Sequence, residues 1–455
     1  MKKFSVATLL LVSSHVFAAG AFDRSVQRGI EIKTFSSPSG SEICVIPKHL
    51  AGAKYRGKDD AKDREAEQEL CSYDLNKSGP TVQDKGVAAC PKVNNTSTAI
   101  EFQEIVKGGT KAELESPAKC GFTRETKTLT KFKTSDNDRT CTYAPGAILT
   151  YHLSRYLGDV LRVPAAVIRT VDISTMQRVA ATALKMRING NLRKGYQNYV
   201  DAYRDPTRWD YSSWIFTSDY KQYYGFLRDK VKGDTSMPGW TENIAGERFE
   251  SMQATRDAFS SASIRDLFGS SLSQAGLQRL QLARDTADLI VLDQLTSQAD
   301  RYTGLNMAAI DLYYFRDGEK ALSSIEKNKV DKGEKPKPEG AILVKRMVAK
   351  DNDCTFVNGN TNAKRGYVAN LRHMHPATYA GVQRLAKAWA VDSSIKDFLA
   401  IEAGMTAKHI TTFGTNLTSV AQTLRSNCDS GLLKLDLDPE AHFLGAESKK
   451  GCDLL

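Results

Sequence analysis

An acidic and an amide side chain share a short turn that follows an apolar stretch. The apolar, helix-like residues 289–299 end in Asp300-Arg301, a turn that contains a glycine, and Asn306. Phosphoryl transfer requires a carboxylate that orients the attacking hydroxyl and a nearby oxygen ligand for a metal ion. Asp300 and Asn306 have the side chains for these two roles. Arg301 is expected to brace the loop rather than to touch a substrate.

A second carboxylate, Asp351, follows another apolar stretch at residues 341–349. Residues 307–315, which lie between the two carboxylates, are typical of a strand. If the two strands pair as a hairpin, the end of the second returns to the start of the first and places Asp351 beside Asn306. The turn would then hold two metal ligands and a base. The residues 317–340, rich in Lys, Glu and Pro, are expected to form a solvated insertion at the far end of the hairpin.

Two motifs upstream suit the binding of phosphate groups. A strand with alternating hydrophobicity ends in Gly108-Gly109-Thr110, and Lys131 lies in a later short strand. Paired glycines allow backbone N–H groups to approach a phosphate closely. They occur more often in ordinary hairpins, so this interpretation of the glycines stays open. The Lys131 side chain is long enough to reach the phosphates of a nucleotide.

The order of these motifs resembles that of the secretory-pathway atypical kinases, the Golgi casein kinase and xylosylkinase family. In that family a Gly-Gly-Thr turn precedes a strand with a phosphate-binding Lys, and a His-Leu-x-Arg helix and an Arg-Val-Pro strand follow. This chain has His-Leu-Ser-Arg at 152–155 and Arg-Val-Pro at 162–164. The chain resembles more distantly the phosphoinositide kinases, the actin-fragmin kinases and the HipA-type bacterial kinases. The resemblance covers roughly residues 99–171 and 277–356.

The resemblance implies an α+β, two-lobed protein-kinase-like fold with a small β-rich N-lobe and a mainly helical C-lobe. It implies ATP as the phosphoryl donor, with the turn at 108–110 covering its phosphates and Lys131 binding them. It also implies that Asp351 and Asn306 hold Mg²⁺ or Mn²⁺, and that Asp300 orients the acceptor hydroxyl. The expected activity is transfer of the γ-phosphoryl group of ATP to a hydroxyl of a protein or glycan.

One departure from the family supports an alternative function. The family usually carries a Glu on the helix that contains the His-Leu-x-Arg segment, whereas this chain has no Glu or Asp between residues 140 and 158. Another carboxylate, such as Glu113, Glu125 or Asp159, would have to replace it. Without a replacement, the chain would be an exported pseudokinase that acts as a binding or scaffold protein. The general lack of ATP in a bacterial periplasm favours the same alternative.

The N-terminus indicates export. Residues 1–18 have a basic start, an apolar core and small residues before an expected cleavage site after Ala18, as in a secretory signal peptide. No later stretch is apolar enough to predict a transmembrane segment. We therefore expect a periplasmic or secreted protein from a bacterium. Its eight cysteines contain no Cys-x-x-Cys pair, which indicates disulfides rather than metal ligands. Eight cysteines allow about 105 connectivities, and the sequence does not choose among them.

Charge and composition add little about partners. A net charge of +10 suits acidic ligands such as phosphates, but the chain has no motif for binding nucleic acid, and none is expected as a partner. The aromatic residues near 196–226 are expected to pack in a core. The predicted regions are a signal peptide (1–18), an N-terminal extension (19–98), the N-lobe (99–171), an aromatic-rich insertion that begins the C-lobe (172–276), the C-lobe with both loops (277–427) and a tail (428–455).

Overall fold

The computed structural model describes most of the chain beyond residue 21. The described residues are 22–23, 26–77, 86–93, 97–121, 123–135, 141–158, 160–209, 215–230, 234–235, 246–301, 307–318, 322–356, 359–446 and 451–453. The predicted signal peptide, Asp159 and Asn306 lie outside these ranges.

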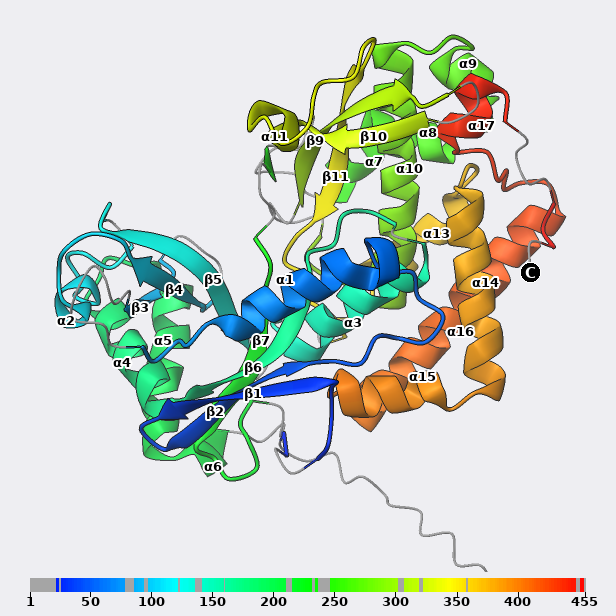
Figure 1. The fold of residues 1–455 in the computed structure, drawn as a ribbon. Coiled ribbons are helices and arrows are strands. Elements are labelled where there is room, and N and C mark those ends of the chain that lie inside the picture. The colour runs from blue at the N-terminus through cyan, green and yellow to red at the C-terminus, as the bar shows by residue number, and fades with distance from the viewer. Residues whose placement is uncertain are drawn as a thin grey trace, which may run out of the picture.

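A seven-stranded antiparallel sheet forms the N-terminal lobe (Figure 1). Its strands lie in the order β1-β2-β6-β7-β5-β4-β3. They are β1 (Glu31–Ser37), β2 (Gly40–Ile46), β3 (Val87–Pro91), β4 (Ile100–Ile105), β5 (Thr126–Thr134), β6 (Ala166–Asp172) and β7 (Gln222–Arg228). The sheet therefore takes strands from beyond both expected N-lobe boundaries, at residues 99 and 171, because β1 to β3 precede the first and β7 follows the second.

Helices cover both faces of this sheet. One face packs against α4 (Ile173–Leu184) and α5 (Gly190–Arg204), and buries Tyr196 and Tyr199 among strand residues such as Phe102. The spacing of Leu192, Tyr196 and Tyr199 on α5 places them on one side of the helix. Tyr196, Tyr199 and Tyr223 thus pack in a core, as expected, whereas Tyr203 is 46% exposed. Trp214 and the side chain of Trp209 lie outside the described part of the chain. The short helices α2 (Lys111–Leu114) and α6 (Pro206–Trp209) and the 3₁₀ turn Lys58–Asp60 lie in the connections.

Two helices lie between the sheet and the rest of the molecule (Figure 1). The helix α3 (Ala144–Tyr156) contains the His-Leu-Ser-Arg segment, has Pro145 in its first turn, and is buried along its whole length. The helix α1 (Ala61–Ser72) from the N-terminal extension contacts α3 through Asp63 and Glu67. The N-terminal extension is thus part of the N-lobe core.

The C-terminal lobe is mainly helical and surrounds α10 (Gln274–Leu295), which agrees with the helix expected from the sequence before Asp300. Apart from its first turns, α10 is almost entirely buried. The other helices are α7 (Gly246–Ser251), α8 (Gln253–Phe259), α9 (Ile264–Phe268), α12 (Thr361–Arg365), α13 (Tyr367–Asn370), α14 (Pro376–Val391), α15 (Ser394–Asp397), a π-helical turn (Phe398–Glu402), α16 (Ala407–Asp429) and α17 (Pro439–Leu444).

A second antiparallel sheet in this lobe confirms the predicted pairing of the two apolar stretches. The strands β9 (Met307–Arg316) and β11 (Ile342–Ala349) pair with Met307 opposite Ala349. The end of β11 therefore returns to the start of β9, as expected. The insertion between them adds β10 (Leu322–Glu326) to the sheet and forms α11 (Lys327–Asp331), and β8 (Asp234–Thr235) pairs with β9.

All eight cysteines form disulfides, as expected: Cys44–Cys71, Cys90–Cys120, Cys141–Cys354 and Cys428–Cys452. Three of them join cysteines that are 24–30 residues apart, whereas Cys141–Cys354 joins the two lobes across 213 residues. The predicted α+β class, with a β-rich N-lobe, a mainly helical C-lobe and stabilising disulfides, is confirmed. Within the described residues, no helix is both long enough and apolar enough to cross a membrane.

Candidate functional site

Three cations from the N-lobe sheet share one carboxylate of the C-lobe. Asp351 lies two residues after the end of β11 and has a positive φ of 42°, a backbone conformation that costs energy for a residue other than glycine. Its Oδ1 lies 3.1 Å from Nη1 of Arg228, 3.6 Å from Nζ of Lys133 and 4.0 Å from Nζ of Lys131. The loop after β11 thus contacts side chains of β5 and β7 in the N-lobe sheet.

The cations and the carboxylate alter one another's pKa. Burial acts to raise the pKa of Asp351, but Arg228, Lys133 and Lys131 outweigh it and hold that pKa well below its usual range. The carboxylate is therefore charged. Burial lowers the pKa of Lys131 well below its usual value, and the neighbouring Lys133 lowers it further, while Asp351 acts in the opposite direction.

Lys133 has a second and closer partner in Asp353. Its Nζ donates to both carboxylate oxygens of Asp353, at 2.8 and 3.2 Å. Burial alone would lower the pKa of Lys133, but Asp351 and Asp353 raise it. The backbone N–H of Tyr143, next to the start of α3, donates to the carbonyl of Asp353 at 2.7 Å. Asp353 is therefore fixed between β5 and α3.

The helix α3 lacks the carboxylate expected on it, and Asp353 lies between the start of this helix and Lys133. Neither described candidate replaces it: Glu113 accepts from the backbone of Thr110, and Glu125 pairs with Lys119 at 3.2 Å. Asp159 lies outside the described residues. The strand lysine that donates hydrogen bonds to Asp353 is Lys133 rather than Lys131.

Asp300 is linked to Asp351 through one side chain. Gln298 donates from Nε2 to the carbonyl of Asp351 at 3.2 Å and accepts at Oε1 from the backbone N–H of Asp300 at 3.1 Å. The loop after α10 and the loop after β11 are therefore held side by side. The structure thus brings Lys131 and Asp351 together and places the loop that carries Asp300 next to that of Asp351.

Arg301 braces these two loops, as expected. It is fully buried and donates to both carboxylate oxygens of Asp293 at 3.0 and 3.1 Å. It also donates to the carbonyl of Lys350 at 2.6 Å and to Oδ1 of Asn352 at 2.7 Å. Because its guanidinium reaches residues on either side of Asp351, it fixes the backbone that carries this carboxylate.

The interlobe disulfide Cys141–Cys354 lies beside Asp300. A carboxylate oxygen of Asp300 and the two sulfur atoms lie within 4.8 Å of one another. The backbone N–H of Ala299 donates to the carbonyl of Cys354 at 3.0 Å. Both sulfur atoms are bonded to each other and are not metal ligands. The disulfide fixes Asp300 relative to the segment that leads into α3.

The Gly108-Gly109-Thr110 turn lies at the other end of β4. Lys131 is paired with Glu101, near the start of β4, whereas the turn follows its last residue, Ile105. Gly109 has a φ of 120°, which favours glycine. Thr110 caps α2 through a reciprocal contact with the residue three positions later. Lys131 therefore lies next to Asp351, whereas the turn lies at the opposite end of β4.

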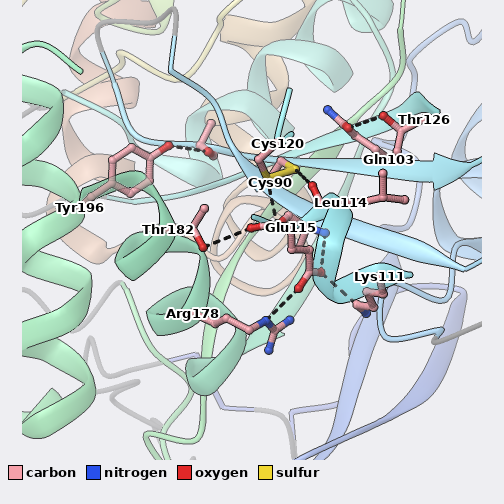
Figure 2. Close-up of a disulfide and its surroundings, with 12 residues drawn as sticks. Cys90, Gln103, Lys111, Leu114, Glu115, Cys120, Thr126, Arg178, Thr182 and Tyr196 are labelled. Carbon is pink, nitrogen blue, oxygen red and sulfur yellow. Dashed lines mark hydrogen bonds and ion pairs between the residues drawn. A yellow bond between two sulfur atoms is a disulfide. The ribbon is translucent and has the colours of Figure 1, made fainter. Parts of the chain in front are cut away.

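The segment after the turn is attached to β3 and α4 (Figure 2). Glu115 accepts from the backbone N–H of Ala89 at 2.8 Å and from Nε of Arg178 at 3.1 Å, with Nζ of Lys111 at 4.0 Å. The disulfide Cys90–Cys120 lies next to these contacts in Figure 2. The segment after the turn is therefore held by a disulfide and by the ion pairs of the buried Glu115.

Sequence reasoning missed three residues of the site: Lys133, Arg228 and Asp353. Two of them had a visible signal. Lys133 lies two residues after Lys131, on the same face of the strand, and Asp353 lies two residues after Asp351. Arg228 had none, because its strand lies in the segment expected to be an aromatic insertion. The remaining predicted ligand, Asn306, lies outside the described residues.

A scan against protein-family models and a search of curated proteins found no match for this chain. Among solved structures, it is similar to the Golgi casein kinase, with 12% identity and a TM-score of 0.42 over 84% of this chain and 80% of that one. It is similar to the Golgi casein kinase with Mn/ADP bound (11%, TM-score 0.40, 82% and 77%) and to hydra Fam20 with sugar (12%, TM-score 0.40, 80% and 88%). These structures come from the family that the sequence motifs resemble.

Proposed function

We propose that the chain is an exported kinase that transfers the γ-phosphoryl group of ATP to a hydroxyl of a protein or glycan. One observation carries this proposal: Nζ of Lys131 is buried without a hydrogen-bond partner among the described residues, and it faces the Asp351 carboxylate. A buried ammonium group without a hydrogen bond is costly unless a ligand supplies one. Asp300, on the adjoining loop, places a carboxylate nearby for an acceptor hydroxyl.

Each residue has a separate task in the proposed reaction. Lys131 binds the phosphates of the donor through its ammonium group. Asp300 accepts a hydrogen bond from the acceptor hydroxyl and orients it toward the transferred group. Arg301 and Gln298 keep both loops in position. The turn at 108–110, predicted to cover the phosphates, stays a prediction that the experiment below does not require.

A divalent metal fits this site when the phosphates of the donor are bound there as well. Oδ1 of Asp351 is buried without a hydrogen-bond partner in the described part of the chain, which suits a metal ligand. Asp353 is committed to Lys133 and Asn352 to Arg301. Asp351, with Asn306, would therefore hold Mg²⁺ or Mn²⁺. When bound, the metal neutralises negative charge on the phosphates.

Export fits the disulfides, because cysteine pairs of this kind persist in oxidising compartments. The predicted signal peptide supplies the route, and a kinase outside the cytoplasm would meet ATP beyond the cell that made it. The pseudokinase alternative drew support from the lack of ATP in a periplasm and from the missing carboxylate on α3. Because Asp353 pairs with the strand lysine Lys133, the second argument no longer favours the alternative.

The test is ATP turnover by the oxidised mature protein with Mg²⁺ and with Mn²⁺, compared with Asp300→Ala and Asp351→Ala. A matched control is Asp331→Ala, which removes an exposed carboxylate on α11. We expect metal-dependent turnover in the parent protein and the control, and its loss in the two site variants. Folded parent protein that shows no turnover with either metal would contradict the proposal.

A further inference from the structure

The cations of the site outnumber the carboxylates that neutralise them. Lys131 on β5 and Arg228 on β7 lie directly opposite each other in the sheet. Like charges at opposed positions destabilise a sheet. Glu101 faces Lys131 from β4 on the other side, but no ion pair joins these two described residues. The sheet therefore holds two neighbouring cations whose nearest shared counter-charge is Asp351.

Lys131 and Arg228 also have unused hydrogen-bonding capacity. Nζ of Lys131 and Nη1 of Arg228 are buried and have no hydrogen-bond partner among the residues that the structure describes. Lys131 as a whole is only 9% exposed. Lys133 differs from both, because it donates two hydrogen bonds to Asp353. Of the three cations, Lys131 and Arg228 are therefore the two that can accept an anionic ligand.

Two further lysines increase the positive charge. Lys92 is close enough to influence the pKa of Lys131 and of Asp351, and Lys350 is close enough to be influenced by Arg228 and Asp351. Two lysines from β5, one arginine from β7 and these two lysines thus lie near Asp351, whereas Asp353 contacts only Lys133 among them. Such an excess of positive charge attracts anions and opposes the entry of a free divalent cation.

We propose that Lys131 and Arg228 form a site that binds the oligophosphate of the donor without a divalent metal. A guanidinium donates two parallel hydrogen bonds to phosphate oxygens, and an ammonium group adds a point charge. Once phosphate oxygens take these donors, Asp351 no longer shares its Oδ1 among three cations and becomes available as a ligand. This inference rests on the proposed function for the identity of the donor, and it adds Arg228 as a phosphate-binding residue.

The experiment measures binding of ADP and of inorganic tripolyphosphate by calorimetry, in EDTA and in Mg²⁺. We compare the parent protein with Lys131→Met and Arg228→Met. The matched control is Lys127→Met, which removes the same charge from the same strand, β5, at an exposed position opposite Glu104. In EDTA we expect both ligands to bind the parent protein, each site variant to bind at least about 10-fold more weakly, and the control to change by less than about 3-fold.

Several outcomes would overturn this inference. Binding of ADP in Mg²⁺ but not in EDTA would do so while leaving the kinase proposal intact. Equal weakening by Lys127→Met and Arg228→Met would mean that net charge, and not this site, binds the anion. If Arg228→Met does not fold, Arg228→Lys retains the charge without the paired donors, and we expect about 3- to 10-fold weaker binding. Arg228-dependent binding in EDTA without turnover in any metal would support this inference and contradict the proposed function.

Discussion

Two of the buried clusters in which arginine or lysine meets aspartate are built differently. In the first cluster, between α1 and α3, Asp63 accepts from Nε and Nη2 of Arg155 at 2.8 and 3.1 Å. It also accepts from Nε of Arg56 at 2.8 Å and from the backbone N–H of that residue at 2.7 Å. The remaining donors of Arg155 reach Ser154 and the carbonyl of Val163.

In the second cluster, around Asp351, two cations keep buried donors without a hydrogen-bond partner in the described residues. The pKa of Asp63 and that of Asp351 are both lowered against the effect of burial, so both carboxylates are charged. Hydrogen bonds from Arg155 contribute to this lowering at Asp63, whereas charges without hydrogen bonds account for it at Asp351. The first cluster is complete by itself and stabilises the fold, while the second is complete only with a ligand.

The largest predicted effect is a difference in turnover between variants of the second cluster and a variant of the first. We expect Asp300→Asn and Asp351→Asn to lower turnover by about 10²- to 10⁴-fold, because each removes a charge that acts on the reacting groups. Asp63→Asn should leave the turnover of its folded fraction within about 3-fold of the parent protein. The measurement is ATP turnover normalised to folded protein by circular dichroism. A comparable loss in Asp63→Asn would abolish the distinction between the clusters.

Removing the interlobe disulfide tests how the two lobes that form the second cluster are held together. The double variant Cys141→Ala/Cys354→Ala should lose about 5 kcal/mol of unfolding free energy, against about 3 kcal/mol for Cys428→Ala/Cys452→Ala, because the first pair closes a much longer loop. The measurement is urea unfolding of both variants under oxidising conditions. Equal losses would indicate that the lobes stay together without this bond.

Removing one arginine from each cluster should give different changes in stability. Arg155→Met leaves Asp63 buried with fewer partners, and we expect it to lower the free energy of unfolding by about 3–5 kcal/mol. Arg228→Met relieves repulsion with Lys131, and it should change that free energy by no more than about 1 kcal/mol in either direction. The measurement is urea unfolding at low salt. A large loss in Arg228→Met would mean that the second cluster also stabilises the fold.

Another buried carboxylate, Asp288 on α10, makes the stability of the protein depend on pH. It accepts from Oγ1 of Thr378 at 2.7 Å, and Nε of Arg284 is 3.9 Å away. Burial raises its pKa from 3.8 to about 6. Because the folded state holds this proton more tightly than the unfolded state, the contribution of Asp288 to stability falls as pH rises from about 4 through 6, by up to about 3 kcal/mol.

Asp288→Asn should remove this part of the pH dependence. The parent protein and the variant would be unfolded by urea at several pH values between 4 and 7, and the difference between their free energies of unfolding compared. We expect the variant to gain stability relative to the parent as pH rises. A constant difference across this range would show that Asp288 does not titrate there.

Local sequence patterns predicted those parts of the site that depend on local structure. The apolar stretches that became β9 and β11 flank the turn that places Asp351, and their pairing followed from the hairpin. The bracing role of Arg301 followed from its place next to Asp300. Both predictions concern residues whose positions are set by adjoining helices and strands.

Contacts between distant segments were not visible in the sequence. The position of Arg228 depends on β7 entering the sheet between β6 and β5, after a helical segment that separates it from β6. The contact of Asp63 with Arg155 depends on α1 docking across 92 residues of sequence. Nothing local to either residue indicates its partner, because tertiary packing decides it. The cysteine pairing was left open for the same reason.

The disulfide between Cys141 and Cys354 also affects what happens to the site when a protease cleaves the chain. The exposed residues 332–340 lie between Asp300 and Asp351 in the sequence, and loops of this kind are preferred sites of cleavage. A cut there would put the two aspartates on different fragments. Cys141 would remain on the first fragment and Cys354 on the second, so the disulfide would keep the fragments covalently joined at the site itself. A nicked molecule would therefore retain both halves of its site.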